Sequence, residues 1–183
     1  KTFTRRKGLC LARKIITRLG VEYVNPKEVT IDYKWKKNVG IPVGSLRRGA
    51  DFIGDIDIIL TKKISVKDIE KLNIPGLTDL SGGEKWIKFK YDVNGQSIGV
   101  DIFIFLHALS WGAALIHSTG PVQYNTRIRK KIKTEKWEKT DHMGEGWILS
   151  QNGLFKNDKM ITTYTERDLQ KFLNVRERNP ENR

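Results

Sequence analysis

The chain has 183 residues, a length that suits one ordinary domain or two small ones and excludes a large appended nuclease or receptor module. Its 34 Lys and Arg residues outnumber its 21 Asp and Glu residues, and the formal net charge of +13 favours a polyanionic partner over a merely solvated basic surface. One cysteine, Cys10, excludes an internal disulfide, and the lack of a long apolar run or signal-peptide pattern predicts a protein that is neither membrane-spanning nor secreted.

Residues 5–19 predict a basic amphipathic helix that Gly20 ends, with Cys10 packed in it. The apolar side chains at helical spacing are Leu9, Ala12, Ile16 and Leu19. Residues 21–43 predict short strands leading to Gly44. Within them, residues 32–37 interleave aromatic and cationic side chains, which favours a solvated hairpin over a DNA contact.

The most informative stretch begins at Gly44, where a predicted turn with a cationic pair, Arg47 and Arg48, precedes a strand that starts at Asp55. In a strand, residues two apart share a face, so Asp55 and Asp57 project together while the Ile and Leu residues between and after them face the other way. Two carboxylates in an apolar run repel each other unless a cation balances them. The pair therefore indicates a divalent-cation site.

A third acid lies on a later predicted hairpin. Ser65 and Asp68 form a capping-box pattern for a short helix that Pro75-Gly76 ends. Two antiparallel strands, 86–93 and 96–106, then flank an Asn-Gly turn, and Asp101 lies in the second strand. If that strand pairs beside the Asp55 strand, three acids converge and can hold two Mg²⁺ ions; the alternative is a lone Asp neutralised by a neighbouring cation.

Near residue 108 the composition becomes helical and basic, so we predict one domain over residues 1–107 and another over 108–183, and an α+β fold class overall. The second domain has a predicted helix over 111–117 and another opened by Thr119 as N-cap with Pro121 at its first position. A hairpin around Asn152-Gly153, a last helix begun by Thr165 with Asp168, and a polar tail over 176–183 follow.

These motifs resemble family X DNA polymerases. Residues 44–61, Gly-Ser-Leu-Arg-Arg-Gly-Ala-Asp-Phe-Ile-Gly-Asp-Ile-Asp-Ile-Ile-Leu-Thr, are similar nearly position for position to the active-site segment of that family's palm domain. Residues 111–129 resemble its nucleotide-selecting segment, and 152–155 and 161–168 its C-terminal hairpin and closing helix. A Gly-Ser and Asp-x-Asp palm also occurs in antibiotic-modifying and tail-adding transferases, but the Thr-Gly and Gly-Leu-Phe segments are typical of family X.

The resemblance covers essentially the whole chain and implies a nucleotidyltransferase palm, with a mixed or antiparallel sheet and two helices, followed by a small helical domain with a β-hairpin. The implied catalytic and metal-binding residues are Asp55, Asp57 and Asp101, with two Mg²⁺ ions that Mn²⁺ could replace. The implied nucleotide-binding residues are Gly44, Ser45, Arg48, Gly54, His117, Ser118, Thr119, Gly120 and Asn125. The implied DNA-binding residues are Arg127, Arg129, Lys130 and Lys133, and a cis peptide bond is expected before Pro121.

The implied activity is that of a viral-type, monomeric repair polymerase that fills short gaps in DNA, as in base excision repair. Its partners would be gapped or nicked DNA, deoxynucleoside triphosphates and a DNA ligase, and it would work in the nucleus or at a viral replication site. A template-independent terminal transferase and a catalytically silent DNA-end-binding module are the alternatives. Three residues depart from the family pattern: Ser118 replaces a common aromatic, Gly99 a basic residue, and His117 a frequent Tyr.

Overall fold

A computed structural model describes residues 2–138, 146–150 and 152–183, with side chains described as far as residue 131 in the first range. The chain forms two compact units. One contains Lys1–Glu28 and Lys36–Leu106, and the other contains Val29–Trp35 and His107–Arg183. The segment Val29–Trp35 therefore belongs with the C-terminal residues and not, as predicted, with the first domain. No helix among the described residues has the length and apolarity needed to cross a bilayer.

The first unit is built on a six-stranded mixed sheet with the strand order β2-β3-β5-β8-β7-β6. These strands are β2 (Glu22–Tyr23), β3 (Val39–Pro42), β5 (Asp55–Leu60), β6 (Leu77–Gly82), β7 (Trp86–Val93) and β8 (Gln96–Ile104). The pairs β2–β3 and β5–β8 are parallel and the other neighbours are antiparallel. A separate antiparallel pair joins β1 (Phe3–Thr4) to β4 (Phe52–Ile53). Strand β6 was not predicted.

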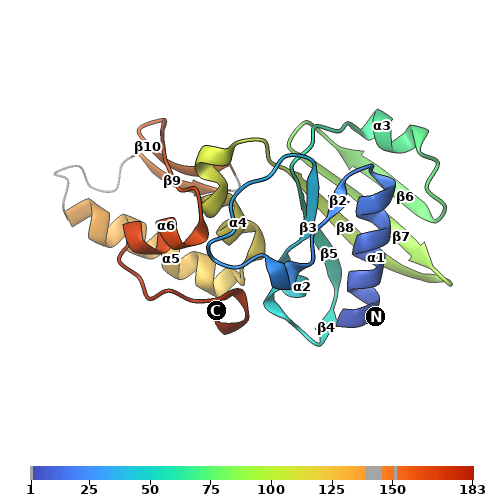
Figure 1. Ribbon diagram of the computed structural model, residues 1–183, viewed down its shortest axis with the longest axis horizontal. Coiled ribbons are helices and arrows are strands. Elements are labelled where there is room, and N and C mark those ends of the chain that lie inside the picture. Colours follow the sequence, from blue (N-terminus) through green and yellow to red (C-terminus); the bar gives the residue numbers. More distant parts are fainter. Residues whose placement is uncertain (1, 139–145, 151) are drawn as a thin grey trace. The chain divides into compact units, whose positions relative to one another are not determined.

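Two helices cover one face of this sheet (Figure 1): α1 (Arg5–Arg18) and α3 (Val66–Lys71). The apolar stripe of α1 packs against Ile56, Ile58 and other inward residues of the sheet, which confirms the predicted amphipathic helix. Cys10, however, is exposed, so the prediction of a packed thiol is wrong. The capping box of Ser65 and Asp68 is confirmed, but α3 ends at Lys71 instead of continuing to Pro75-Gly76.

The segment predicted as a turn at Gly44 is instead a short helix, α2 (Gly44–Arg48). Gly49, with φ of 81°, ends it in the left-handed conformation that glycine adopts readily. The helical turn separates the predicted cationic pair, because consecutive side chains on a helix point in different directions. Arg47 is consequently buried, whereas Arg48 is half-buried. A 3₁₀ turn, Pro26–Glu28, precedes this region in the same unit.

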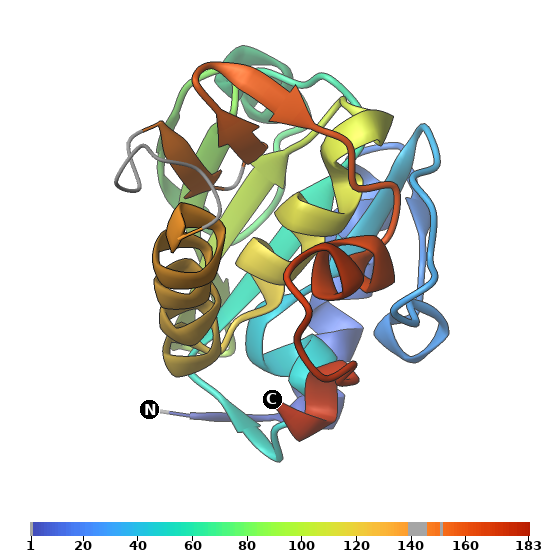
Figure 2. The same ribbon diagram turned by 90° about the vertical axis from the view of Figure 1, so that its left-hand side faces the viewer.

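The second unit contains the helices α4 (Trp111–Thr119), α5 (Val122–Glu138) and α6 (Glu166–Phe172), and 3₁₀ turns at Ala108–Ser110 and Pro180–Asn182. In Figure 2, α5 in gold and α6 in red lie on either side of α4. An antiparallel sheet of β9 (Trp147–Ser150), β10 (Gly153–Lys156) and β11 (Lys159–Ile161) completes the unit. The predicted hairpin is confirmed and gains one strand. Thr119 is the last residue of α4, so its prediction as an N-cap is wrong.

The residues predicted as a hairpin, 32–37, form no strand, and those as far as Trp35 belong to the second unit. The indole N–H of Trp111 donates to the Tyr33 carbonyl at 3.0 Å, and Arg167 Nη1 lies 2.7 Å from Asp32 Oδ2. The predicted capping box of Thr165 and Asp168 is confirmed. The end of the chain is more than a polar tail, because the side chains of Arg183 and Glu166 form an ion pair at 3.0 Å that is fully buried.

Candidate active site

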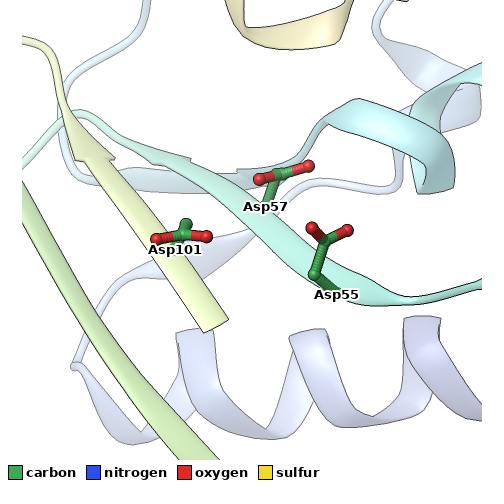
Figure 3. A group of neighbouring side chains, drawn as sticks. All are labelled: Asp55, Asp57 and Asp101. Atoms are coloured by element: carbon green, nitrogen blue, oxygen red, sulfur yellow. The ribbon is translucent and has the colours of Figure 1, made fainter. Parts of the chain in front are cut away.

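Three carboxylates meet on one face of the first unit's sheet (Figure 3): Asp55 and Asp57 on β5 and Asp101 on β8. Strands β5 and β8 run parallel, and Asp57 lies directly opposite Asp101 in their register. One carboxylate oxygen from each of the three residues lies within 4.8 Å of the others. The condition set by the sequence, that the Asp101 strand must pair beside the Asp55 strand, is thus met.

Alternation along the two strands explains why the acids share a face. Ile56, Ile58, Val100 and Ile102 point into the core beneath α1 and are at most 1% exposed. Because successive strand residues face opposite sides, the residues between them must point to the other side. Burial of the apolar side chains therefore fixes the acids in place. Asp55 is exposed, whereas Asp57 and Asp101 are half-buried.

Burial and mutual repulsion make two of the acids, Asp57 and Asp101, hold their protons more tightly than usual, so the pKa of each is raised. Burial, followed by repulsion from Asp55 and Asp101, raises the pKa of Asp57 from 3.8 to about 7, and Arg48 only partly offsets the rise. Burial and the charge of Asp55 likewise raise the pKa of Asp101, against a lowering effect of Lys88 and of a hydrogen bond from the Trp86 side chain. The cluster carries more negative charge than its neighbours neutralise.

Helix α2 approaches Asp57 closely through Gly44. A Cβ atom at residue 44 would collide with the Asp57 carboxylate, and the φ of Gly44, +54°, is one that glycine adopts most readily. The Val43 amide donates to the Asp57 carbonyl at 2.8 Å, which ties the start of α2 to β5. Of the other residues predicted to bind phosphates, Ser45 is half-buried on α2, and Gly54 is exposed immediately before β5.

Two residues beside Asp101 were missed by the sequence analysis. Lys88 lies directly opposite Asp101 in the antiparallel pair of β7 and β8, and its Nζ lies 4.9 Å from the centre of the Trp86 ring. The Asn94-Gly95 turn pairs Val93 with Gln96, and counting back from it places Lys88 opposite Asp101. The register of the hairpin was therefore the sequence signal that could have placed Lys88 and Trp86 beside Asp101.

The donor set fits a divalent metal. Three carboxylates within reach of one another offer hard oxygen ligands of the kind that Mg²⁺ and Mn²⁺ take. Burial and then mutual repulsion raise the pKa values of two of them, Asp57 and Asp101. A bound cation would relieve the repulsion that the sheet imposes on them.

The other predicted nucleotide-binding residues lie at the end of α4 and the start of α5, in the second unit. Ser118 Oγ donates to the Ala114 carbonyl at 2.8 Å, and Asn125 Nδ2 donates to the His117 carbonyl at 2.9 Å. Thr119 and Gly120 are buried, and the bond from Gly120 to Pro121 is cis, as the resemblance implied. Asn125 is only 7% exposed, and its Oδ1 is buried without a hydrogen-bond partner among the described residues.

The predicted DNA-binding cations lie on α5. Arg127, Arg129 and Lys130 are exposed, and Lys133 lies outside the residues whose side chains are described. The exposed cations of α5 form a surface suited to phosphate groups.

His117 lies near one of these cations. Burial and then the charge of Arg129 lower the pKa of His117, which favours its neutral imidazole.

A mixed sheet on which three carboxylates converge is an arrangement suited to the class of enzymes that transfer phosphoryl groups with the help of metal ions. Comparison with known proteins narrows this class. The sequence pattern of the DNA polymerase beta thumb matches residues 114–183. The chain is 30% identical over 188 residues to Repair DNA polymerase X of African swine fever virus (isolate Pig/Kenya/KEN-50/1950), covering 98% of each chain.

The same named protein from two further African swine fever virus isolates, Badajoz 1971 Vero-adapted and Tick/Malawi/Lil 20-1/1983, is also 30% identical, over 185 residues and 97% of each chain. The chain belongs to the family X DNA polymerases.

Proposed function

We propose that this family X polymerase fills short gaps in DNA by transferring nucleotides to a primer 3′-hydroxyl with the help of two Mg²⁺ ions. The observation that carries the proposal is the parallel register of β5 and β8, which sets Asp57 opposite Asp101 and next to Asp55. Phosphoryl transfer asks a protein chiefly for alignment and for neutralisation of charge, and this cluster supplies ligands for the ions that do both.

Each acid has a distinct proposed task. Asp55 and Asp57 would ligate both metals, and Asp101 would ligate only the metal at the primer end and accept the proton of the 3′-hydroxyl. The metals, when bound, neutralise the triphosphate and lower the pKa of the attacking hydroxyl. Arg48, which already acts on the charge of Asp57, would then share the triphosphate with Ser45 and the backbone at Gly44 and Gly54.

The second unit would select the nucleotide and hold the DNA. Thr119 and Gly120 would support the sugar, Asn125 would touch the minor-groove edge of the new base pair, and His117 would contact the nucleotide in its neutral form. The space beside Ser118 would admit the sugar's 2′ position. The DNA-binding cations would be Arg127, Arg129, Lys130 and Lys133.

A primer-extension assay tests this function on three substrates: a duplex with a one-nucleotide gap, an open primer-template and a single strand. We expect template-directed addition that requires Mg²⁺ or Mn²⁺, stops on chelation and is fastest on the gap. Template-independent extension of the single strand would favour a terminal transferase, and DNA binding without extension would favour a silent end-binding module.

Gap filling leaves a nick between a 3′-hydroxyl and a 5′-phosphate, so we propose that a DNA ligase acts next. Because the substrate is cellular or viral DNA, the proposed place of action is the nucleus or a viral replication site. We further propose that the protein acts as a monomer, which sedimentation with and without gapped DNA can test.

A further inference from the structure

Helix α1 carries charges that the proposed polymerase reaction does not use. Its 14 residues contain no acid and six cations: Arg5, Arg6, Lys7, Arg13, Lys14 and Arg18. The buried stripe of the helix, which includes Ile15 and Ile16, packs into the core of the first unit. What remains is a face with one sign of charge.

Four of these cations are exposed on that outward face, which we call the α1 basic face: Arg6, Arg13, Lys14 and Arg18. The helix rises about 1.5 Å per residue, so these residues span roughly 18 Å. One strand of B-DNA carries a phosphate for about every 3.4 Å of the duplex axis, so a face laid along that axis covers the rise of roughly five phosphates. Its length and charge fit a nucleic-acid backbone.

The first turn of α1 adds an independent observation. The N-terminal end of a helix is positive, and cations there are unfavourable, yet Arg5, Arg6 and Lys7 occupy that turn. The position of Arg5 has a local reason, because its Nε and Nη2 donate hydrogen bonds to the Leu46 carbonyl at 3.4 Å. The Lys7 Nζ similarly donates to Gln96 Oε1 at 3.4 Å. Arg6 is exposed at this positive end of the helix, so a negatively charged partner would offset the unfavourable placement of its cation.

The other end of the face borders a hollow. Lys14 and Arg18 line a cavity of about 300 Å³ together with residues 74–76 and Asn94 of the β7–β8 turn. Its acid, Asp92, accepts a hydrogen bond from the Gly95 amide at 2.9 Å and so is engaged within the turn. A concave surface flanked by cations suits a sugar-phosphate backbone.

Helix α1 and the three carboxylates lie on opposite faces of the same sheet (Figures 1 and 3). DNA on the α1 basic face is therefore not the primer end held at Asp101. We propose that this face is a second DNA-binding site, which holds the phosphate backbone of a separate duplex segment while the first site holds the gap. The inference rests on the proposed function only in taking DNA as the partner.

Bridging of two DNA molecules tests the site. A donor-labelled gapped duplex is bound to the protein at saturation, and an acceptor-labelled intact duplex is added while energy transfer is recorded. The test variant combines Arg6→Gln, Lys14→Gln and Arg18→Gln, which removes three charges and keeps Arg13 over the Tyr23 ring. A matched control removes three exposed cations on and beside α3, which are Lys63, Lys67 and Lys71.

We expect the wild type and the control to capture the second duplex and the test variant to capture it at least tenfold more weakly. The slope of log affinity against log salt for this second binding should fall by about 2 to 3, as expected for three lost phosphate contacts. Thermal melting of the test variant should match that of the wild type. Equal capture by the test variant, or equal loss in the control, overturns the proposal.

Two further measurements distinguish a second DNA site from damage to the carboxylate cluster and from a membrane-binding surface. Filling of a short gapped duplex should stay within about twofold in the test variant, because none of its changes touches the carboxylate cluster. If neither the wild type nor the variants fill gaps, the proposed function is wrong, but the bridging assay still tests whether the α1 basic face binds DNA. Binding of vesicles with anionic phospholipid, without capture of a second duplex, would assign the face to a membrane and overturn the proposal.

Discussion

The carboxylate cluster of the first unit and the 117–125 segment of the second are built in opposite ways. Strand register brings three acids together, and burial, followed by repulsion from the other two acids, raises the pKa of Asp57 to about 7. The 117–125 segment is instead tied down by hydrogen bonds from Ser118 Oγ to the Ala114 carbonyl and from Asn125 Nδ2 to the His117 carbonyl. The carboxylate cluster is therefore a region of electrostatic repulsion, whereas the 117–125 segment is held by local hydrogen bonds that leave one buried acceptor, Asn125 Oδ1, without a partner in the part of the chain that the structure describes.

The two regions should respond differently to substitution. A site held by burial around it keeps its geometry when a carboxylate is neutralised, so such a change removes chemistry and spares the fold. A segment held by its own hydrogen bonds loses local stability when one of them is cut. Variants of the cluster should therefore lose activity first, and variants of the segment should lose stability first.

Asp101→Asn should reduce nucleotide incorporation at least about 1,000-fold, because a neutral amide neither accepts the hydroxyl proton nor holds a metal as a carboxylate does. DNA affinity should change little. Single-turnover extension of gapped DNA measures the first and fluorescence anisotropy the second. Asp51→Asn, an exposed acid of the same unit, is the matched control. Extension within about tenfold of wild type, a difference of 1.4 kcal/mol, would contradict the three-acid site.

The metal-free protein should lose stability as the pH rises. Because the folded pKa of Asp57, about 7, lies above its ordinary value of 3.8, the folded state binds this proton more tightly than the unfolded state does. The resulting stabilisation is full below about pH 4 and is lost as the pH rises through about 7, by roughly 2 to 4 kcal/mol.

Melting temperatures in chelator between about pH 5 and pH 8, for wild type and Asp57→Asn, check this pH dependence. The variant should have the flatter profile and the advantage at high pH, and Mg²⁺ should restore the wild type there. Parallel profiles for the two proteins would show that repulsion at Asp57 does not limit stability.

Ser118→Phe should raise the preference for deoxynucleotides over ribonucleotides by about 1 to 3 kcal/mol, the size of a typical overpacking clash. Ser118 is half-buried and its proton is used by the Ala114 carbonyl, so its oxygen is left to accept a bond from a 2′-hydroxyl. The preference is measured as the ratio of kcat/KM for a deoxynucleotide to that for the matched ribonucleotide, in the wild type and in Ser118→Phe. Ser118→Ala separates size from hydrogen bonding, and an unchanged ratio in both variants would place the sugar gate elsewhere.

Asn125→Ala should lower the free energy of unfolding by about 1 kcal/mol, since it removes the bond to the His117 carbonyl and leaves that acceptor in a buried segment. Denaturant titration measures the change, with the exposed neighbour Thr126→Ala as control. The loss should exceed any destabilisation by Asp101→Asn. An unaltered unfolding midpoint would mean that the 117–125 segment is not held by its own bonds.

Sequence alone determined the elements whose signals are local. The Asn94-Gly95 turn defined the β7–β8 hairpin, and the two capping boxes marked the starts of α3 and α6. Alternation placed Asp55 and Asp57 on one face. These features depend on residues a few positions apart, so backbone sterics and local hydrogen bonds suffice to specify them.

Tertiary structure alone decided what joins distant residues. Parallel pairing of β5 with β8 places Asp101 beside Asp57. The close approach of α2 to the Asp57 carboxylate requires a glycine at residue 44. Arg183 is buried because its side chain forms an ion pair with Glu166. The strand β6 and the assignment of Val29–Trp35 to the second unit were likewise not readable from local patterns. Burial and charge pairing across long sequence separations select these arrangements, and no short window of sequence contains both partners.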